Sequence, residues 1–238
     1  MRHYRDFAPL VALALLLPLA ACDDDDDPME PEPDPAIIRV VNVAEGTADV
    51  EVLGPGSTTP LAMLDFGQMT NTCVEVPAGD QTIAFSSGEE EIASVEADLA
   101  EGERYLLVLV SNGAGDDVRA VIGSDEVTAS AGNNALRLIN ATSTVGDVFV
   151  TPPDEDPAAQ FLVAGNISPL ASSNLTLDDP YHRSTAHTRV RLFADGETID
   201  PLSDITLTGL PGSRVATVVF TEEGVDAEDR AFLVFPCQ

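Results

Sequence analysis

The chain has 238 residues and a formal net charge of −30, and all of its basic residues are arginine. Such a charge repels nucleic acid and anionic lipid head groups, so neither is an expected partner. Because the chain contains no lysine, a phosphate-binding loop that ends in Gly-Lys, Schiff-base chemistry and serine–lysine hydrolysis are excluded.

The first residues have the parts of an export signal. Arg2 and Arg5 precede an apolar stretch, residues 7–18, which is shorter than the ~20 apolar residues that a transmembrane helix needs. Leu19-Ala20-Ala21-Cys22 then resembles the lipobox of bacterial lipoproteins. We therefore expect residues 1–21 to be a signal peptide and Cys22 to carry lipid, which makes a membrane the first expected partner.

An acidic, proline-rich segment follows the cysteine. It opens with aspartates at residues 23–27, and its charges and prolines oppose both helix and strand. Residues 22–36 are therefore expected to be the lipidated cysteine and a disordered acidic tether. An acidic run here resembles surface-export signals, whereas one aspartate after the cysteine resembles the inner-membrane retention signal of enteric bacteria. We favour the outer membrane or cell surface over the periplasmic face of the inner membrane.

From residue 37 onward, short β-branched segments alternate with turns that contain Gly or Pro, and no segment of helical period carries caps. The pattern predicts an all-β fold, two tandem Ig-like or transthyretin-like antiparallel β-sandwiches at residues 37–128 and 135–238. The expected strands are residues 37–43, 48–53, 72–76, 81–85, 92–99, 104–110 and 118–122 in the first half, and 136–140, 147–151, 188–194, 204–207, 214–221 and 231–235 in the second.

The two halves contain matching residues in the same order, which indicates duplication. A small, polar linker, residues 129–134, separates them. The second half carries extra residues at 175–188, which are polar and broken by proline and are read as a long loop. The matches include Arg39 with Arg137, Asn42 with Asn140, Asp49 with Asp147, Phe85 with Phe193 and Val108 with Val218.

Each half begins with a hydrophobic–Arg–hydrophobic–hydrophobic–Asn strand that leads to Asp-Val-x-Val. The first half continues through a Val-Pro-Ala-Gly turn, residues 76–79, and a Gly-x-Arg-Tyr strand, residues 102–105. This pattern resembles a bacterial envelope family, domain of unknown function four-three-nine-seven, a sandwich repeat often found in tandem. The resemblance covers nearly all of residues 37–236. It implies an architecture and an envelope location, and no reaction.

One loop superficially matches a dinucleotide-binding motif. Residues 113–118 read Gly-x-Gly-x-x-Val, but that motif needs a helix next, whose N-terminus holds the pyrophosphate. The following residues, 118–122, read as a strand, so we expect a hairpin loop and no bound cofactor.

The histidines of the second half, His182 and His187, are the main candidates for chemistry. Asp178, Asp179 and Ser184 lie near them in sequence, so a zinc site or a Ser-His-Asp triad is conceivable. However, no Gly-x-Ser-x-Gly elbow occurs, and a polar insertion preorganises neither site. We expect no catalytic residue and no metal site, with a solvated loop as the default.

Acidic clusters leave weak divalent-cation binding open. They are Asp116/Asp117, Asp154-Glu155-Asp156 and Asp226/Glu228/Asp229, and none has the spacing of a dedicated calcium loop. The recurring pairs Asn42/Asn140 and Asp49/Asp147 could mark a shared ligand site. Such residues more often bind loop backbone and fix a turn, which is the interpretation we favour.

Cys73 and Cys237 remain once Cys22 is acylated, and an exported chain predicts a disulfide between them. Taken together, these features predict a non-catalytic, membrane-anchored envelope lipoprotein with a structural or binding role and an unknown envelope or extracellular ligand. The alternatives are a calcium-dependent adhesion module and a secreted hydrolase or metal enzyme that uses His182 and His187.

Overall fold

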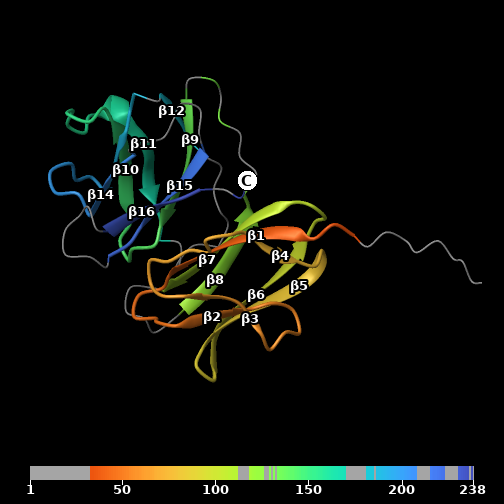
Figure 1. Ribbon diagram of the computed structural model, residues 1–238. Helices are drawn as coiled ribbons and strands as arrows, with labels where there is room; N and C mark the ends of the chain where they lie inside the picture. Colours follow the sequence, from red (N-terminus) through yellow and green to blue (C-terminus); the bar gives the residue numbers. More distant parts are fainter. Residues whose placement is uncertain are drawn as a thin grey trace, which may run out of the picture. The chain divides into compact units, whose positions relative to one another are not determined.

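The computed structural model describes residues 33–111, 118–125, 129, 131, 133–169, 181–184, 186–207, 215–222, 230–235 and 237. They belong to one compact unit, Pro33–Gln238, with sixteen strands and one 3-10 turn in its described part (Figure 1). The expected all-β class is therefore confirmed. Residues 1–32, which include the expected signal peptide, Cys22 and most of the expected tether, lie outside the described residues. Within the described part, no helix has the length and apolar character needed to cross a membrane.

The first half forms two four-stranded sheets, with the orders β4-β1-β7-β8 and β3-β2-β5-β6. Their facing side chains make one apolar core, in which Ile83, Phe85 and Leu107 are fully buried. β6 contacts β8 and closes one side of the sandwich, so β3 and β4 border the other side. The strands are β1 (Ala36–Val43), β2 (Val50–Leu53), β3 (Pro60–Leu64), β4 (Val74–Val76), β5 (Gly79–Ser87), β6 (Glu90–Leu99), β7 (Arg104–Ser111) and β8 (Val118–Ser124).

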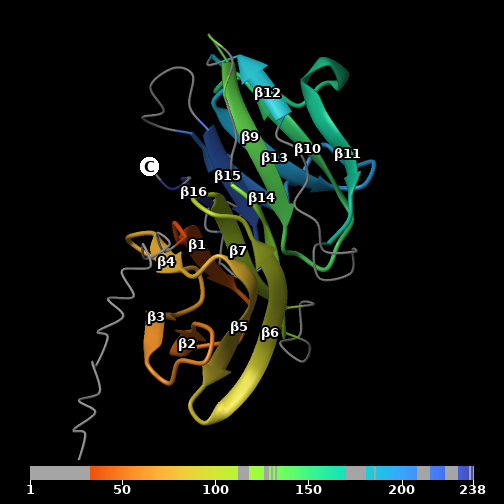
Figure 2. The ribbon, with the colours of Figure 1, turned by 90° about the vertical axis from the view of Figure 1, so that its right-hand side faces the viewer.

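The second half has the corresponding sheet orders, β12-β9-β15-β16 and β11-β10-β13-β14 (Figure 2). A second apolar core lies between these sheets, with Leu136, Leu192 and Phe220 fully buried. Its elements are β9 (Asn133–Asn140), β10 (Gly146–Thr151), the 3-10 turn η1 (Ala159–Phe161), β11 (Leu162–Ile167), β12 (Tyr181–Ser184), β13 (Arg189–Ala194), β14 (Ser203–Thr206), β15 (Val215–Phe220) and β16 (Ala231–Val234).

The sheets are not purely antiparallel, which corrects the expectation from the sequence. β1 pairs with β7 in parallel, and β9 pairs with β15 in parallel, while the other strand pairs are antiparallel. A parallel pair needs a long connection. The chain provides it by completing β2 to β6 before β7, and β10 to β14 before β15. The alternation of apolar and polar residues and the turn residues indicate local hairpins. They do not indicate which distant strands pair in parallel.

A third apolar cluster joins the two halves. Along β1, Ile38 and Val40 face the first core, whereas Val41 and Val43 belong to the third cluster. Ile139, Ala141, Val219 and Val234 of the second half belong to it as well. The sheets that contain β1 and β9 are therefore covered on both faces. The halves therefore share a buried surface.

Strand register changes one of the sequence matches between the halves. Val41 lies beside Val108, and its counterpart Ile139 lies beside Val219. Val108 therefore corresponds to Val219, and not to Val218. A slip of one residue reverses the face of a strand. Accordingly, Val108 and Val219 both face the junction, whereas Val218 belongs to the second core.

The polar insertion of the second half is only partly a loop. Tyr181–Ser184 forms β12, which pairs antiparallel with β9 over Asn133–Leu136. It takes the place that β4 has beside β1. Backbone pairing with β9 imposes the strand despite the polar sequence. Residues 170–180, including Asp178 and Asp179, lie outside the described residues.

Candidate functional site

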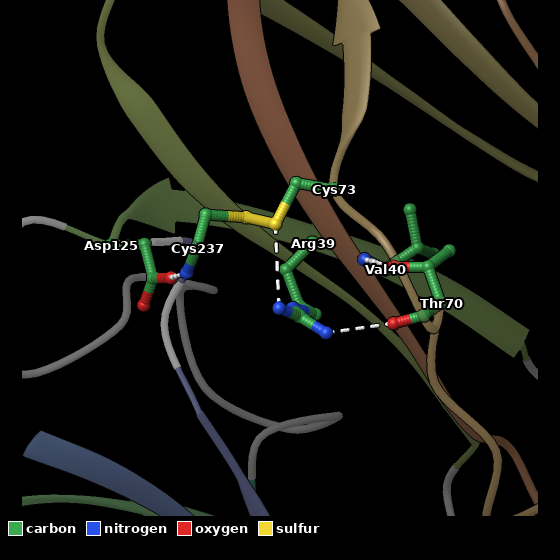
Figure 3. Close-up of a disulfide and its surroundings, with 6 residues drawn as sticks. All are labelled: Arg39, Val40, Thr70, Cys73, Asp125 and Cys237. Atoms are coloured by element: carbon green, nitrogen blue, oxygen red, sulfur yellow. Dashed lines mark hydrogen bonds between the residues drawn. A yellow bond between two sulfur atoms is a disulfide. The ribbon is translucent and has the colours of Figure 1, made fainter.

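Cys73 and Cys237 form a disulfide in the structure, with the pairing expected from the sequence (Figure 3). Their Cα atoms are 5.9 Å apart, across a sequence separation of 164 residues. Cys73 directly precedes β4 of the first half, and Cys237 follows β16 of the second. Cys237 is buried, with 2% of its surface exposed. The bond therefore fastens the end of the chain to an edge of the first sandwich.

Arg39 of β1 lies beside this bond and holds the segment that leads to it. Its Nη2 donates to Cys73 Sγ at 3.3 Å, and its Nη1 donates to the Thr70 carbonyl at 2.8 Å (Figure 3). The Thr70 amide donates to the Val40 carbonyl at 2.9 Å, and the Val40 amide donates to Thr70 Oγ1 at 3.2 Å. The chain before Cys73 is thus fixed to β1 at several points.

A buried ion pair crosses between the halves near the same bond. Arg137 Nη1 of β9 lies 3.2 Å from Asp125 Oδ1, which follows β8, and both side chains are almost fully buried. The Cys237 amide donates to Asp125 Oδ2 at 3.3 Å. Burial raises the pKa of the Asp125 carboxyl, and the Arg137 charge and the Cys237 amide act against that rise. Charge, amide and disulfide together form the polar end of the junction.

The matched arginines therefore have a role that sequence reasoning did not assign. Arg39 and Arg137 alternate along their strands with core residues, on the same face as Val41 and Ile139, which belong to the junction cluster. Arg39 contacts the disulfide, and Arg137 contacts Asp125. Their shared position in the sequence pattern was a signal for this face, but the pattern gave no partner for either residue.

The matched asparagines fix equivalent turns. Asn42 Nδ2 donates to the Leu64 carbonyl at the end of β3, and its Oδ1 accepts the Ala44 amide. Asn140 Nδ2 donates to the Ile167 carbonyl at the end of β11, and its Oδ1 accepts the Thr142 amide. Both asparagines are buried. These contacts favour the turn-fixing interpretation over a shared ligand site.

Replacing Asn140 or Asn42 by alanine is expected to lower the free energy of unfolding by about 1–3 kcal/mol, because each change leaves buried backbone groups without a partner. Thermal unfolding measures the loss, at roughly 2–4 °C per kcal/mol for a chain of this size. Asn71→Ala is the matched control, since Asn71 is exposed and should change stability little. Equal losses at all three positions would contradict the proposed role.

The matched aspartates also close loops. Asp147 accepts the Asn166 amide at 2.8 Å on Oδ1 and the Gly196 amide at 3.2 Å on Oδ2. Asp49 has a positive φ of 51° and donates its amide to Asp65 Oδ1 at 3.0 Å. Both positions bind neighbouring loop groups, so they too act in backbone geometry.

The histidine-bearing segment is only partly described. His182 belongs to β12, and its side chain lies outside the described residues. The His187 ring meets Phe161 edge-on, with ring centroids 5.5 Å apart. Its Nδ1 is buried and has no hydrogen-bond partner in the described part of the chain. The Ser184 hydroxyl accepts the Ala186 amide at 3.3 Å. In the described part, these contacts do not join Ser184 and His187 into a catalytic pair.

Of the three acidic clusters that could bind a divalent cation, only residues 154–156 are described. Residues 154–156 are exposed, and the Glu155 carbonyl accepts a hydrogen bond from Arg191. Across the described ranges, no group of three or more His, Cys, Asp or Glu side chains is arranged to hold a metal ion. Asp116/Asp117, the Gly-x-Gly loop and Asp226/Glu228/Asp229 lie outside the described residues. Val118–Ser124 is a strand, and not the helix that a dinucleotide site would need.

Arg191 is a buried charge that the sequence did not single out. Its Nη2 donates to Thr151 Oγ1 at 2.9 Å and to the Glu155 carbonyl at 2.7 Å, and its guanidinium lies 5.9 Å from the Phe193 ring centroid. Burial lowers its pKa, and the nearby Arg189 charge adds to the effect. The residue anchors the segment after β10 to β13, which is a structural role.

A groove of about 580 Å³ lies between β3 and β4, on the side of the first sandwich opposite the contact between β6 and β8. It is lined by residues 61–64 of β3, residues 67–72 of the connection and Val74 of β4. None of these residues is charged. Met63 at its border is 58% exposed, which is unusual for a large apolar side chain. No sequence pattern predicted this groove.

The described structure is thus an all-β protein with two sandwiches and a disulfide at their junction. The family described as "Domain of unknown function (DUF4397)" matches residues 26–151, which is more than half of the chain, so the chain belongs to this family. The match extends past the first sandwich to the end of β10. No curated protein matches the chain.

Proposed function

We propose that the chain is a non-catalytic lipoprotein of the bacterial envelope, held to a membrane by lipid on Cys22. In this proposal two β-sandwich modules, joined as one body, present a binding surface to an envelope or extracellular ligand. The disulfide between Cys73 and Cys237 carries the proposal. Such bonds persist in oxidising compartments and are rare in the cytosol, so the bond agrees with the export signal and the lipobox.

The junction supports a presenting role over a catalytic one. Arg39, Asp125 and Arg137 are occupied by the disulfide, by backbone groups and by one another. They stiffen the contact between the halves, and each of the three charged groups has a polar partner in the described part of the junction. A rigid body on an acidic tether suits a protein that holds a surface away from a membrane. We place it at the outer membrane or cell surface.

We also infer that residues 37–128 and 135–238 are two copies of one unit. Each half has the same sheet order with a parallel pair at the same place, and Asn42 and Asn140 bind the ends of corresponding strands. Independent origins would have to reproduce the topology and the buried asparagine together. Duplication accounts for both.

Cys22→Ser is expected to move the protein almost completely from the membrane fraction to the soluble fraction, because a lipid anchor is lost with its cysteine. Incorporation of radiolabelled fatty acid should occur in the wild-type chain and stop in the variant. Cys73→Ser is the matched control, since it removes a cysteine outside the lipobox and should keep the label. A Cys22→Ser protein that stays on membranes would refute the anchor.

A further inference from the structure

Two strand edges border the groove between β3 and β4. In the described residues, β3 pairs with β2 and β4 pairs with β1, and neither has a second neighbour. Four consecutive residues of β3 line the groove, so the strand exposes its edge there and not only one face. An edge strand carries main-chain N–H and C=O groups that can pair with another strand. On β3 the Leu64 carbonyl already accepts Asn42 Nδ2, so an added strand pairs with the residues before Leu64.

The lining limits the class of ligand. It has no charged side chain for a phosphate or a metal ion, and no aromatic ring on which a sugar could stack. It offers the apolar side chains of Leu61 and Met63 beside Thr72, while the Gln68 side chain is bonded to Asp65 and Met69 packs partly against the junction cluster. Methionine adapts its shape to varied apolar partners. Apolar pockets beside free main-chain groups fit an extended peptide.

The wall of the groove opposite β3, residues 67–74, is held in position by contacts within the protein before any ligand binds. Thr70 is held by the Val40 backbone and by the Arg39 guanidinium, and the wall ends at the disulfide of Cys73. Gln68 and Met69 are held as well. The Gln68 carbonyl accepts the backbone amide of Asn42, and Met69 forms an isolated antiparallel β-bridge with Val41 of β1. A wall that needs no ordering on binding costs a ligand less free energy.

The surroundings of the groove are acidic. Glu51 lies directly across from Met63 on β2, Asp65 follows β3, and Glu75 lies on β4. Arg39, which contacts the Thr70 carbonyl beside the groove, is engaged with Thr70 and Cys73. An uncharged groove with an acidic rim is complementary to a segment with an uncharged centre and basic ends.

We propose that this groove binds an extended segment of a partner protein as an added strand on β3. The segment alternates apolar and polar residues at its centre and carries basic residues at its ends. This inference rests on the proposed function, because it names the class of ligand that the anchored modules present. It does not require the lipid, so the two can fail separately.

The test uses the full chain carrying Cys22→Ser and a labelled, end-capped peptide, Arg-Val-Thr-Val-Thr-Val-Arg. Fluorescence anisotropy measures binding, and amide chemical shifts locate it. Met63→Arg should weaken binding about tenfold or more, because it removes an apolar contact and repels the basic ends. Ile199→Arg is the matched control: Ile199 is 81% exposed and does not line the groove, so binding should be unchanged.

A peptide with the same side chains and alternate N-methylated amides separates strand addition from side-chain contact. Its binding should be lost, because an added strand needs its amide donors. Shifts confined to β3 and residues 67–74 support the proposal. No binding by the parent peptide, equal weakening by both variants, or undiminished binding of the methylated peptide would overturn it. Each of these results is independent of whether Cys22 carries lipid.

Discussion

Serine in place of Cys237 is expected to lower the free energy of unfolding by roughly 3–5 kcal/mol. The bond closes a loop across 164 residues, and the chain-entropy model gives about 5 kcal/mol for a loop of that length. The change also releases the segment after β16, where the backbone amide of residue 237 donates to the buried Asp125 carboxylate. Denaturant unfolding of the oxidised proteins measures the loss as a lower midpoint.

The controls for this loss are the other cysteine variants and the reduced wild-type protein. Cys73→Ser and the double variant should lose as much as Cys237→Ser, because each removes the same bond. A reductant should bring the wild type to the level of the variants and leave the variants unchanged. If the variants keep the wild-type midpoint, the apolar cluster between the halves is sufficient to hold them, and the bond adds nothing.

Much of the fold could be predicted because its signals are local. Short β-branched segments and turn residues located most of the strands, and Asn42 with Asn140 marked equivalent turns. The buried junction also had a signal. Residues 106–110 of β7 form a continuous apolar run, and such a run is typical of a strand covered on both faces.

The remainder depends on contacts between distant residues. Phe85 and Phe193 match in sequence, but Phe85 lies beside Val52 of β2, and the corresponding Val150 of β10 lies beside Val190. The phenylalanines are therefore not equivalent, and Phe193 packs with Phe149 in a separate cluster. Identity of residues cannot fix register, because register is set by pairing partners. The parallel pairs and β12 were missed for the same reason.

The candidate groove could not be predicted because its residues are ordinary. Residues 61–64 were not expected to form a strand: Pro60 opens the segment and its side chains are mixed in size. Leu61 and Met63 are apolar residues and belong to no recognised binding or catalytic motif. The groove arises where two sheets leave a side open and a connection is fixed by Arg39 and Cys73. That arrangement exists only in three dimensions.

Arg137→Met is expected to cost about 3–5 kcal/mol of stability at neutral pH, because it leaves the Asp125 carboxylate buried without its counter-charge. Burial already raises the pKa of Asp125 above its ordinary value of 3.8, and Arg137 opposes that rise. Without Arg137 the folded-state pKa rises further. Between 3.8 and this pKa the folded chain holds a proton that the unfolded chain has released. The variant therefore loses stability as pH rises through that window and regains it as pH falls.

Denaturant midpoints of the wild type and Arg137→Met between pH 4 and pH 8 test this. The deficit of the variant should be largest at neutral pH and shrink toward pH 4. Arg39→Met is the matched control, because Arg39 faces the same junction but contacts the disulfide and the Thr70 carbonyl instead of a carboxylate. Its charge has the smallest effect on the pKa of Asp125, so its deficit should change little with pH. A deficit of Arg137→Met that stays constant with pH would show that lost packing, and not the buried charge, sets its cost.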